Sequence, residues 1–476
     1  MKAKNVVSLT EDNLIPDYDS HEGWELKKLK DITKKVPTIK PEFEPERIFG
    51  YVDISSINNE TNKIFEFKKI RGADAPSRAR QSIQSNDVLF SNVRTYLRNI
   101  AIVPDDLDVQ VCSTGFTVLR SNGAIVPKFL FYYTLTNHFI NEVTPQQTGS
   151  QYPATTDRVV KDASIRLPSI PEQHRVVARV EALLSQVNAA RDRLNKVPLI
   201  MKRFRQAVLA AACSGRLTEG WRGENPNIEN IADFIKKLKK EKLTIDKKRM
   251  RYLSDLDFSE CHEIPETWGW VKLGEISIAI DVDHKMPKAM EKGIPLISPK
   301  DFVEPDKIDF KDAKKISHDD YERMSRKITP ESGDILLSRY GTIGKVRKVP
   351  ADLKFQISYS LCLIRPFLDL RRNDYLYWIL QSSPVYHQAL ANDKSSSIPD
   401  LGIKDINNFT IPLPPLEEQY EIVRCVDALI ALADQIEQQV ADATKRTEAL
   451  TQAVLAKAFR GELVATAAEL TKKELL

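Results

Sequence analysis

Two long segments of the chain place apolar residues at alternating steps of four and three, one beginning at Val176 and the other at Ile422. The seam positions are Val176, Val180, Leu183, Val187, Ala190, Leu194 and Val197 in the first segment and Ile422, Val426, Leu429, Ala433, Ile436, Val440 and Ala443 in the second. This spacing is that of a heptad repeat, which predicts two long helices that pair in a left-handed coiled coil.

The two helical segments belong to an internal repeat. LPSIPEQHRVV, residues 167–177, returns as LPPLEEQYEIV, residues 413–423. Shifting the chain by 246 positions aligns residues 165–217 with residues 411–463 without a gap and gives 17 identities in 53 positions. The identities gather at the front of each copy and at QAVLA near its end. Such a repeat predicts two copies of one structural plan within a single chain.

The two predicted helices differ in continuity and in charge. Pro198 should kink or break the first helix near Val197, because proline lacks the backbone N–H that the helix needs. The first segment is basic and the second acidic, and opposite charges favour pairing of the two helices with each other. The alternative is two solvated helical faces without a specific partner. The charged residues are Arg179, Arg191, Arg193, Lys196, Lys202, Arg203 and Arg205 in the first, and Asp427, Asp434, Glu437, Asp442 and Glu448 in the second.

The regions before the helices mix β-rich runs such as DVLFS and FTVLR with helical stretches such as KFLFYYTLTNHFINEV. We therefore predict an α+β fold in which two α/β domains are separated by two long antiparallel coiled-coil helices, with an internal pseudo-twofold repeat. The predicted boundaries are 13–168 and 263–414 for the α/β domains, 169–217 and 415–464 for the helical regions, 218–262 for a basic linker and 465–476 for a C-terminal tail.

Composition adds three expectations. The absence of an apolar run of about 18 residues argues against a membrane protein. The five cysteines lack a CxxC pair, which favours a reducing cytoplasm and argues against a zinc site. Residues 417–476 hold 11 acidic and 7 basic side chains, a net charge of −4, so the rest of the chain carries the +8 that brings the total to +4. A polyanion would bind outside the C-terminal segment.

Catalytic motifs are weak in this sequence. GTIGK, residues 341–345, lacks the spacing of a phosphate-binding loop, and Val346 stands where a hydroxyl would bind magnesium. Asp17 with Glu25 and Lys27 matches only the loosest nuclease pattern. The sequence contains no G-x-S-x-G or H-E-x-x-H. These features favour a binding protein and predict no catalytic or metal-ligating residues.

Basic and polar residues cluster in two related loops, SNVRTYLRN and SRYGTIGKV, and in two polar segments, QQTGSQY and DKSSSIP. Lys and Arg neutralise phosphates, and Arg, Asn and Gln recognise base edges. Each loop could also be an ordinary exposed turn. The basic run at residues 236–252 could be an arm that contacts DNA or a solvated linker or helix. The predicted DNA-binding residues are Arg71, Arg78, Arg80, Asn92, Arg94, Tyr96, Arg98, Gln147, Ser150 and Gln151 in the first domain, and Ser338, Arg339, Tyr340, Thr342, Lys345, Arg347, Lys394 and Ser396 in the second.

The duplication suggests a geometric purpose. A helix of about 42 residues spans about 60 Å, and two antiparallel helices would place one domain at each end. A DNA turn is about 35 Å, so such a frame suits two short half-sites about one turn apart. Because the two domains differ in sequence, we expect the half-sites to differ as well.

The repeated [LI]-P-x-[LI]-x-E-Q opening, the QAVLA ending and the GD-[IV]-L-x-S loop of the second domain, NDVLFS in the first, resemble the specificity subunit of type I restriction-modification systems. The resemblance covers essentially the whole chain, although Pro171 replaces Glu417 in the first copy and NVRTYLR replaces a glycine-containing loop. It implies two target-recognition domains and two conserved spacer helices whose outward faces bind modification subunits.

The resemblance further implies a cytoplasmic, non-catalytic subunit that binds double-stranded DNA and no cofactor. Two modification subunits would use S-adenosylmethionine to methylate adenine N6, on an adenine flipped into their pocket, and two restriction subunits would use ATP and Mg²⁺. The competing interpretations are a stand-alone nuclease or methyltransferase and a coiled-coil scaffold that binds no DNA.

Overall fold

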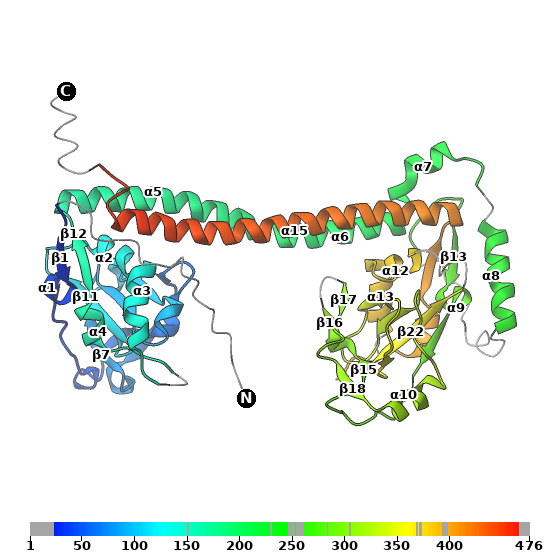
Figure 1. Cartoon of the computed structure of the whole chain (residues 1–476), viewed down its shortest axis with the longest axis horizontal. Coiled ribbons are helices and arrows are strands. Elements are labelled where there is room, and N and C mark those ends of the chain that lie inside the picture. The colour runs from blue at the N-terminus through cyan, green and yellow to red at the C-terminus, as the bar shows by residue number, and fades with distance from the viewer. Residues whose placement is uncertain are drawn as a thin grey trace. The chain divides into compact units, whose positions relative to one another are not determined.

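The computed structural model describes residues 23–149, 152–228, 231–245, 253, 261–282, 284–303, 306–367, 370, 374–392 and 398–465. The chain divides into two compact units: unit 1 is Met1–Asn195 with Ala441–Leu476, and unit 2 is Lys196–Val440. Each unit consists of an α/β domain, called head 1 or head 2, and one pair of helices (Figure 1). In the described ranges, no helix is long and apolar enough to cross a membrane.

Head 1 is built on a four-stranded sheet in the order β2-β11-β8-β9, beside a second sheet in the order β6-β3-β10-β7. All four residues of β8 are buried, as expected of a strand that is covered on both faces. Its Phe90 ring lies 5.3 Å from Phe139 of α3, so this helix closes the core over the first sheet. The elements are β1 Glu25–Lys28, α1 Leu29–Ile32, β2 Thr33–Lys34, β3 Ile48–Val52, β4 Ile57–Asn58, β5 Lys63–Ile64, β6 Lys68–Arg71, β7 Ala79–Ile83, β8 Val88–Ser91, β9 Ile100–Ile102, β10 Gln110–Ser113, β11 Phe116–Ser121, α2 Pro127–Thr134, α3 Asn137–Val143, α4 Asp157–Asp162 and β12 Ser164–Leu167.

Head 2 repeats this plan. Its central sheet has the order β14-β22-β19-β20, and a parallel strand pair, β15 with β21, matches the parallel pair of β3 with β10. The elements are β13 Gly269–Lys272, α9 Leu273–Ile276, β14 Ser277–Asp281, β15 Ile294–Ile297, β16 Phe302–Val303, β17 Lys307–Ile308, β18 Lys314–Ile316, α10 His318–Ser325, β19 Ile335–Ser338, β20 Val346–Lys348, β21 Gln356–Ile357, β22 Leu361–Pro366, α12 Tyr375–Leu380, α13 Ser383–Ala391, α14 Ile403–Asn407 and β23 Thr410–Leu413. The predicted α+β fold and internal repeat are confirmed.

The spacer helices are α5 (Ile170–Leu194), α6 (Val197–Cys213) and α15 (Leu416–Phe459), which is continuous over 44 residues. The first helix is interrupted between α5 and α6, with Pro198 in the first turn of α6, as the proline predicted. Seam positions Val176, Val180, Ile422 and Val426 are buried, and Leu183, Val187, Leu194, Leu429, Ile436 and Val440 are half-buried.

Within each unit the paired helices run antiparallel. In unit 1, Val176 and Val180 at the start of α5 share a core with Leu455 and Phe459 at the end of α15. In unit 2, the end of α6 shares a core with Ile422 and Val426 at the start of α15. The expected pairing of opposite charges occurs here, since Arg205 Nη2 lies 2.7 Å from Asp434 and 2.8 Å from Glu437.

The repeated Glu-Gln pair fastens each helix to its head. The indole N–H of Trp24 donates to Glu172 at 3.0 Å, and that of Trp268 donates to Glu418 at 2.8 Å. The neighbouring glutamines, Gln173 and Gln419, donate to the carbonyl of the proline five residues earlier, at 2.9 and 2.8 Å. The motif therefore fixes the start of each spacer helix against the strand that leads into it.

The segment expected to be a basic linker, residues 218–262, contains α7 (Glu219–Glu224) and α8 (Ile231–Ile245). Ile231 and Phe234 of α8 are buried in the core of unit 2, which gives this helix an apolar face despite its many lysines. Of the basic run predicted at residues 236–252, residues 246–252 lie outside the described residues, and so do residues 466–476 of the expected tail.

Candidate nucleic-acid interface

In head 1, two segments distant in sequence meet and form loop pair 1, residues 92–99 after β8 with residues 152–155 before α4. Arg94 N donates to Pro153 O at 2.8 Å, and the Arg94 guanidinium lies over the Tyr152 ring, 5.3 Å from its centroid. Of the polar segment predicted at residues 146–152, Tyr152 thus contacts the predicted loop, and so does Gln147, whose Nε2 donates to Thr95 Oγ1 at 3.0 Å.

Head 2 contains the matching loop pair 2, residues 339–345 after β19 with residues 398–401. Gly341 N donates to Pro399 O at 2.9 Å, in the place of the bond between Arg94 and Pro153. The bridge between Val93 and Ala154 in head 1 likewise corresponds to the bridge between Tyr340 and Asp400 in head 2. The two heads thus share the backbone of the loop pair and differ in its side chains.

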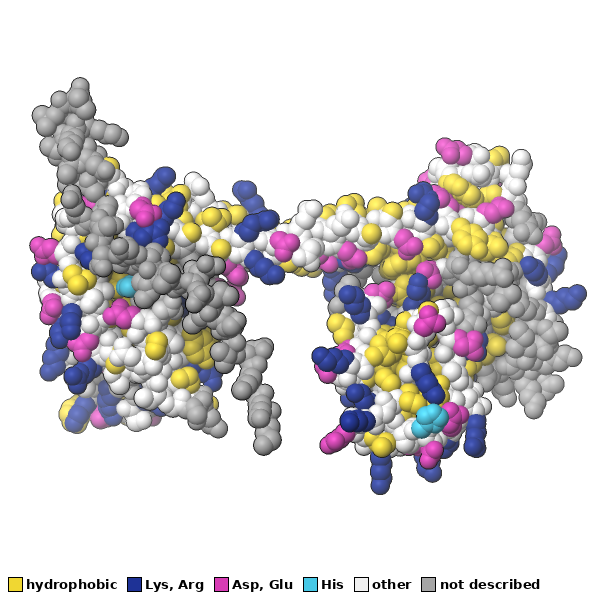
Figure 2. Space-filling view, in the orientation of Figure 1, with side chains coloured by type: hydrophobic (Ala, Val, Ile, Leu, Met, Phe, Trp, Pro, Cys, Tyr) yellow, Lys and Arg dark blue, Asp and Glu magenta, His cyan; other side chains and the backbone are white. Residues whose placement is uncertain are grey.

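The predicted DNA-binding residues differ in exposure. Arg71, Arg78, Tyr96 and Thr342 are exposed, Arg80, Arg94, Arg98, Gln147, Tyr340 and Lys345 are half-buried, and Asn92, Ser338, Arg339 and Arg347 are buried. Ser150, Gln151, Lys394 and Ser396 lie outside the described residues. On the face shown in Figure 2, Lys and Arg side chains gather at the end of head 2 farthest from α15. DNA contact by each of these residues stays a prediction.

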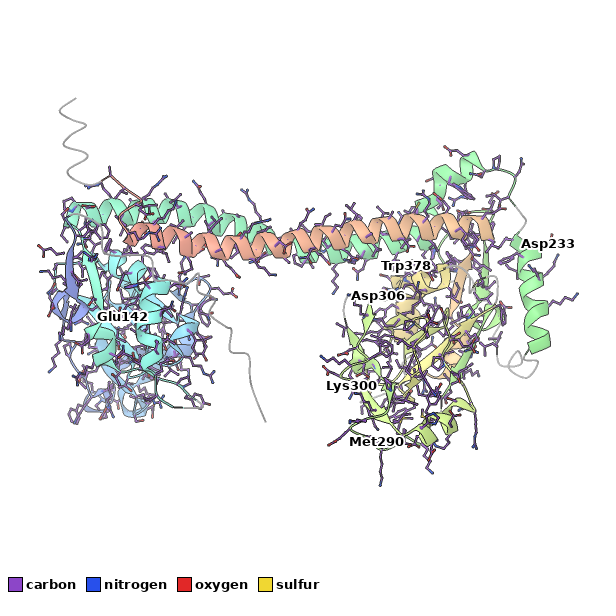
Figure 3. The ribbon with its side chains drawn as sticks, in the orientation of Figure 1. Glu142, Asp233, Met290, Lys300, Asp306 and Trp378 are labelled. Atoms are coloured by element: carbon purple, nitrogen blue, oxygen red, sulfur yellow. The ribbon has the colours of Figure 1, made fainter. Side chains whose placement is uncertain are left out.

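Two arginines are not on the exposed surface where the sequence placed them. Arg347 is 4% exposed, and its guanidinium donates to the carbonyls of Lys307 and Val303, both at 3.2 Å. Asp306, on the turn between these strands (Figure 3), lies 4.0 Å from Arg347 Nε. Arg347 therefore holds the β16–β17 hairpin, because its donors are used inside the domain.

Arg339 is the second correction, since it is 8% exposed and donates to the carbonyls of Leu401 and Tyr359. In head 1, Arg71 and Arg80 reach the surface, but each forms an ion pair with a nearby glutamate, Glu46 and Glu42 respectively. The burial of Arg339 and Arg347 and the ion pairs of Arg71 and Arg80 therefore reduce the positive charge that the predicted residues can offer to phosphates.

Several side chains beside the loop pairs were not singled out in the sequence. Tyr152 lies at the end of the predicted polar segment, and Asp400 follows the other segment by one residue, so position alone could have indicated both. Nothing in the sequence indicated Tyr359. Its ring centroid lies 5.5 Å from those of Tyr340 and His284, which belong to other segments of the chain. Burial lowers the pKa of the Arg98 guanidinium in loop pair 1 below its usual value.

Among the residues described, no three His, Cys, Asp or Glu side chains are placed to hold a metal ion. What the structure does present is a pair of α/β heads, each with one loop pair, carried on paired helices. These features define a modular two-headed recognition protein.

A family model for the type I restriction modification DNA specificity domain matches residues 21–199 and 265–445. The type I restriction enzyme EcoBI specificity subunit of Escherichia coli is 33% identical over 406 residues, which cover 80% of each chain. The HsdS subunit from Thermoanaerobacter tengcongensis has a TM-score of 0.55 at 30% identity over 93% of this chain and 98% of its own. A chain from work on complex assembly and conformational transition of the type I R-M system has a TM-score of 0.71 at 29% identity over 93% of this chain and 99% of its own.

The chain belongs to the family of type I restriction-modification specificity subunits. Its role is the recognition of DNA sequence within a type I system.

Proposed function

We propose that the chain reads an asymmetric, bipartite DNA target, with one half-site for each head. The observation that carries this proposal is the loop pair, which has the same backbone contacts in both heads and different side chains. Loop pair 1 presents Arg94 and Tyr152, whereas loop pair 2 presents Tyr340 and Asp400. Because base edges are read by side-chain donors and acceptors, unlike side chains select unlike half-sites.

The helices set the length of DNA that is left unread. A continuous helix of 44 residues is about 66 Å long at about 1.5 Å per residue, and it is long enough to separate two half-sites by about one turn. The same helices dock the partner subunits through their outward faces, where Leu199, Leu432 and Leu450 are about half exposed.

The partners are two modification subunits and two restriction subunits, in the cytoplasm. Catalysis belongs to them: S-adenosylmethionine serves methylation of adenine N6, and ATP with Mg²⁺ serves translocation and cleavage. This chain supplies the DNA-binding surface and no catalytic group.

Methylation-aware sequencing of the host genome tests the proposal. We expect one methylated motif with two different halves and an unread spacer of constant length, which disappears when the gene for this chain is deleted. A palindromic or uninterrupted motif would contradict the bipartite assignment.

The role of the helices has its own test. Four residues, about one helical turn, are inserted into both spacer helices, and the expected result is a changed spacer length with both half-sites retained. A matched insertion into residues 225–228, which lie between α7 and α8, should leave the spacer unchanged. An unchanged spacer in the helix variant would show that the helices do not measure the DNA.

A further inference from the structure

Arg339 connects three segments of head 2. Its Nε donates to Leu401 O at 2.9 Å and its Nη1 donates to Tyr359 O at 3.0 Å. Its own backbone closes the same junction, because Leu401 N donates to Arg339 O at 2.8 Å. The guanidinium is thus held on two sides by backbone carbonyls.

The same guanidinium also faces two carboxylates. Arg339 Nη2 lies 3.4 Å from Asp400 Oδ1, and Nη1 lies 3.7 Å from Asp281 Oδ1. The other oxygen of Asp281 is 2.9 Å from His284 Nε2, whereas the Asp400 side chain is 51% exposed. Asp400 is therefore an exposed carboxylate at the edge of loop pair 2, oriented by a buried cation.

A carboxylate on a DNA-binding surface repels phosphates, which are the commonest contacts of such a surface. It becomes favourable only where it accepts a hydrogen bond from a base. In the major groove, the available donors are the exocyclic amino groups, N4 of cytosine and N6 of adenine. The buried guanidinium of Arg339 lowers the repulsion by compensating part of the negative charge.

We propose that Asp400 is a specificity-determining residue of head 2 that accepts a hydrogen bond from an exocyclic amino group of the half-site, and that Arg339 is the positioning residue that orients it. This inference rests on the proposed function. Head 1 provides the natural contrast, because its matching residue is Ala154 and its loop pair presents the Arg94 guanidinium instead. A guanidinium donates to guanine, so the two heads are built for opposite hydrogen-bond patterns.

The test uses the full chain assembled with its modification subunits and a library of duplexes randomised in both half-sites. Asp400→Ala, which installs the residue of head 1, should relax one position of the head 2 half-site by roughly tenfold or more and leave the other half-site unchanged. Asp400→Asn is nearly isosteric and folds most readily. It should keep the preference at that position if the base is adenine and shift it to adenine if the base is cytosine, because asparagine pairs with adenine N6 and N7. Asp312→Asn, an exposed change elsewhere in head 2, is the matched control.

Arg339→Ala separates positioning from direct contact. A positioning residue should relax the same position as Asp400→Ala and leave the salt dependence of DNA binding unchanged, whereas loss of a phosphate contact lowers the salt slope by about one. Uniform weakening at every position of the half-site would overturn the positioning role.

The two proposals fail in different ways. If the wild-type complex yields a bipartite motif and both Asp400 variants preserve every position, the reading by Asp400 is wrong and the proposed function stands. If the wild-type complex yields no bipartite motif, the proposed function itself fails.

Discussion

The two units start their spacer helices with the same Glu-Gln pair but stabilise the glutamate differently. In unit 2, Glu418 is completely buried and accepts from Trp268, from Thr218 Oγ1 at 2.6 Å and from the Arg222 guanidinium. In unit 1, Glu172 is 5% exposed and accepts from Trp24. The residues that match Thr218 and Arg222 in the repeat are Val464 and Ala468.

The difference shows which part of the repeat is constant. Both units need a donor from the head to the first turn of the helix, because that contact fixes the junction of strand and helix. The compensation of the buried carboxylate varies: unit 2 uses a cation and a hydroxyl, and unit 1 places the apolar Val464 against its core. The duplication therefore preserves the contact between the tryptophan of the head and the glutamate of the helix, whereas the residues around that contact have diverged.

The largest effect is expected from Arg222→Met. It removes the cation from the buried Glu418 carboxylate, and breaking one partner of a buried pair costs about 3–5 kcal/mol. Urea unfolding of the full chain measures the loss, and hydrogen exchange should localise it to α6 and the start of α15. The double variant Arg222→Met with Glu418→Gln should recover part of the loss, since the uncompensated charge is gone. A loss below about 1 kcal/mol would show that the ion pair adds nothing to the indole contact.

A second, smaller effect compares Trp24→Phe with Trp268→Phe. Both substitutions remove one hydrogen bond to a carboxylate, worth about 1.5–3 kcal/mol, and both delete the same ring atoms. Glu418 keeps Arg222 and Thr218, so we expect the Trp24 variant to lose more stability than the Trp268 variant. Equal losses in urea unfolding would mean that the additional partners of Glu418 do not support its position.

The sequence predicted the helices well because their burial is local and periodic. Each turn of α5 or α15 places an apolar residue at the seam. The break before α6 is predictable from Pro198 alone, because proline lacks the backbone N–H that a continuous helix needs. The loops were also found, since SNVRTYLRN and SRYGTIGKV keep matching positions after equivalent strands. Their pairing with the segments before α4 and α14 is a tertiary contact that no local pattern shows.

The arginines show the limit of that reasoning. Arg339 and Arg347 read as exposed cations because the sequence reveals their charge, and their backbone acceptors lie far away in the chain, at Leu401 and Lys307. The apolar face of α8 was likewise hidden among lysines. The sequence predicts that such an arginine is exposed. In the structure it is buried, because backbone carbonyls distant in the sequence accept its hydrogen bonds.

The two units should also differ in how their stability depends on pH, because unit 1 has a half-buried histidine where unit 2 has a proline. Burial lowers the pKa of His138 in α3 below its usual 6.5, and the matching residue in α13 is Pro384. The unfolded chain then binds the proton more readily, so this stability is complete above pH 6.5 and is lost as the pH falls through the folded pKa. Burial also raises the pKa of Glu142, which acts in the opposite direction in wild type and variant alike.

The measurement is urea unfolding at pH 7.5, 6.5 and 5.5 for the wild type and His138→Gln. We expect the free energy of unfolding of the variant to rise relative to that of the wild type as the pH falls. Hydrogen exchange should locate this change in unit 1. If the difference in free energy of unfolding between the two proteins were constant across this range, the pKa of the imidazole would be the same in the folded and unfolded chain.

The smallest effect is expected at a second contact between each head and its spacer helix, one that does not involve the Glu-Gln pair. In unit 2, the Trp378 indole donates to Asp427 of α15 at 2.9 Å, and burial raises the pKa of that carboxyl. The same place in unit 1 has an ion pair, Lys128 Nζ to Glu181 at 2.7 Å, with side chains 52% and 40% exposed. Water and salt screen such a pair, so Lys128→Met should cost about 0.5 kcal/mol or less, and less still at 1 M salt. Trp378→Phe should cost more and respond less to salt, because it removes a hydrogen bond from a neutral donor to a carboxylate and not an ion pair. If Lys128→Met cost more than Trp378→Phe, the exposed ion pair would be the stronger of the two attachments.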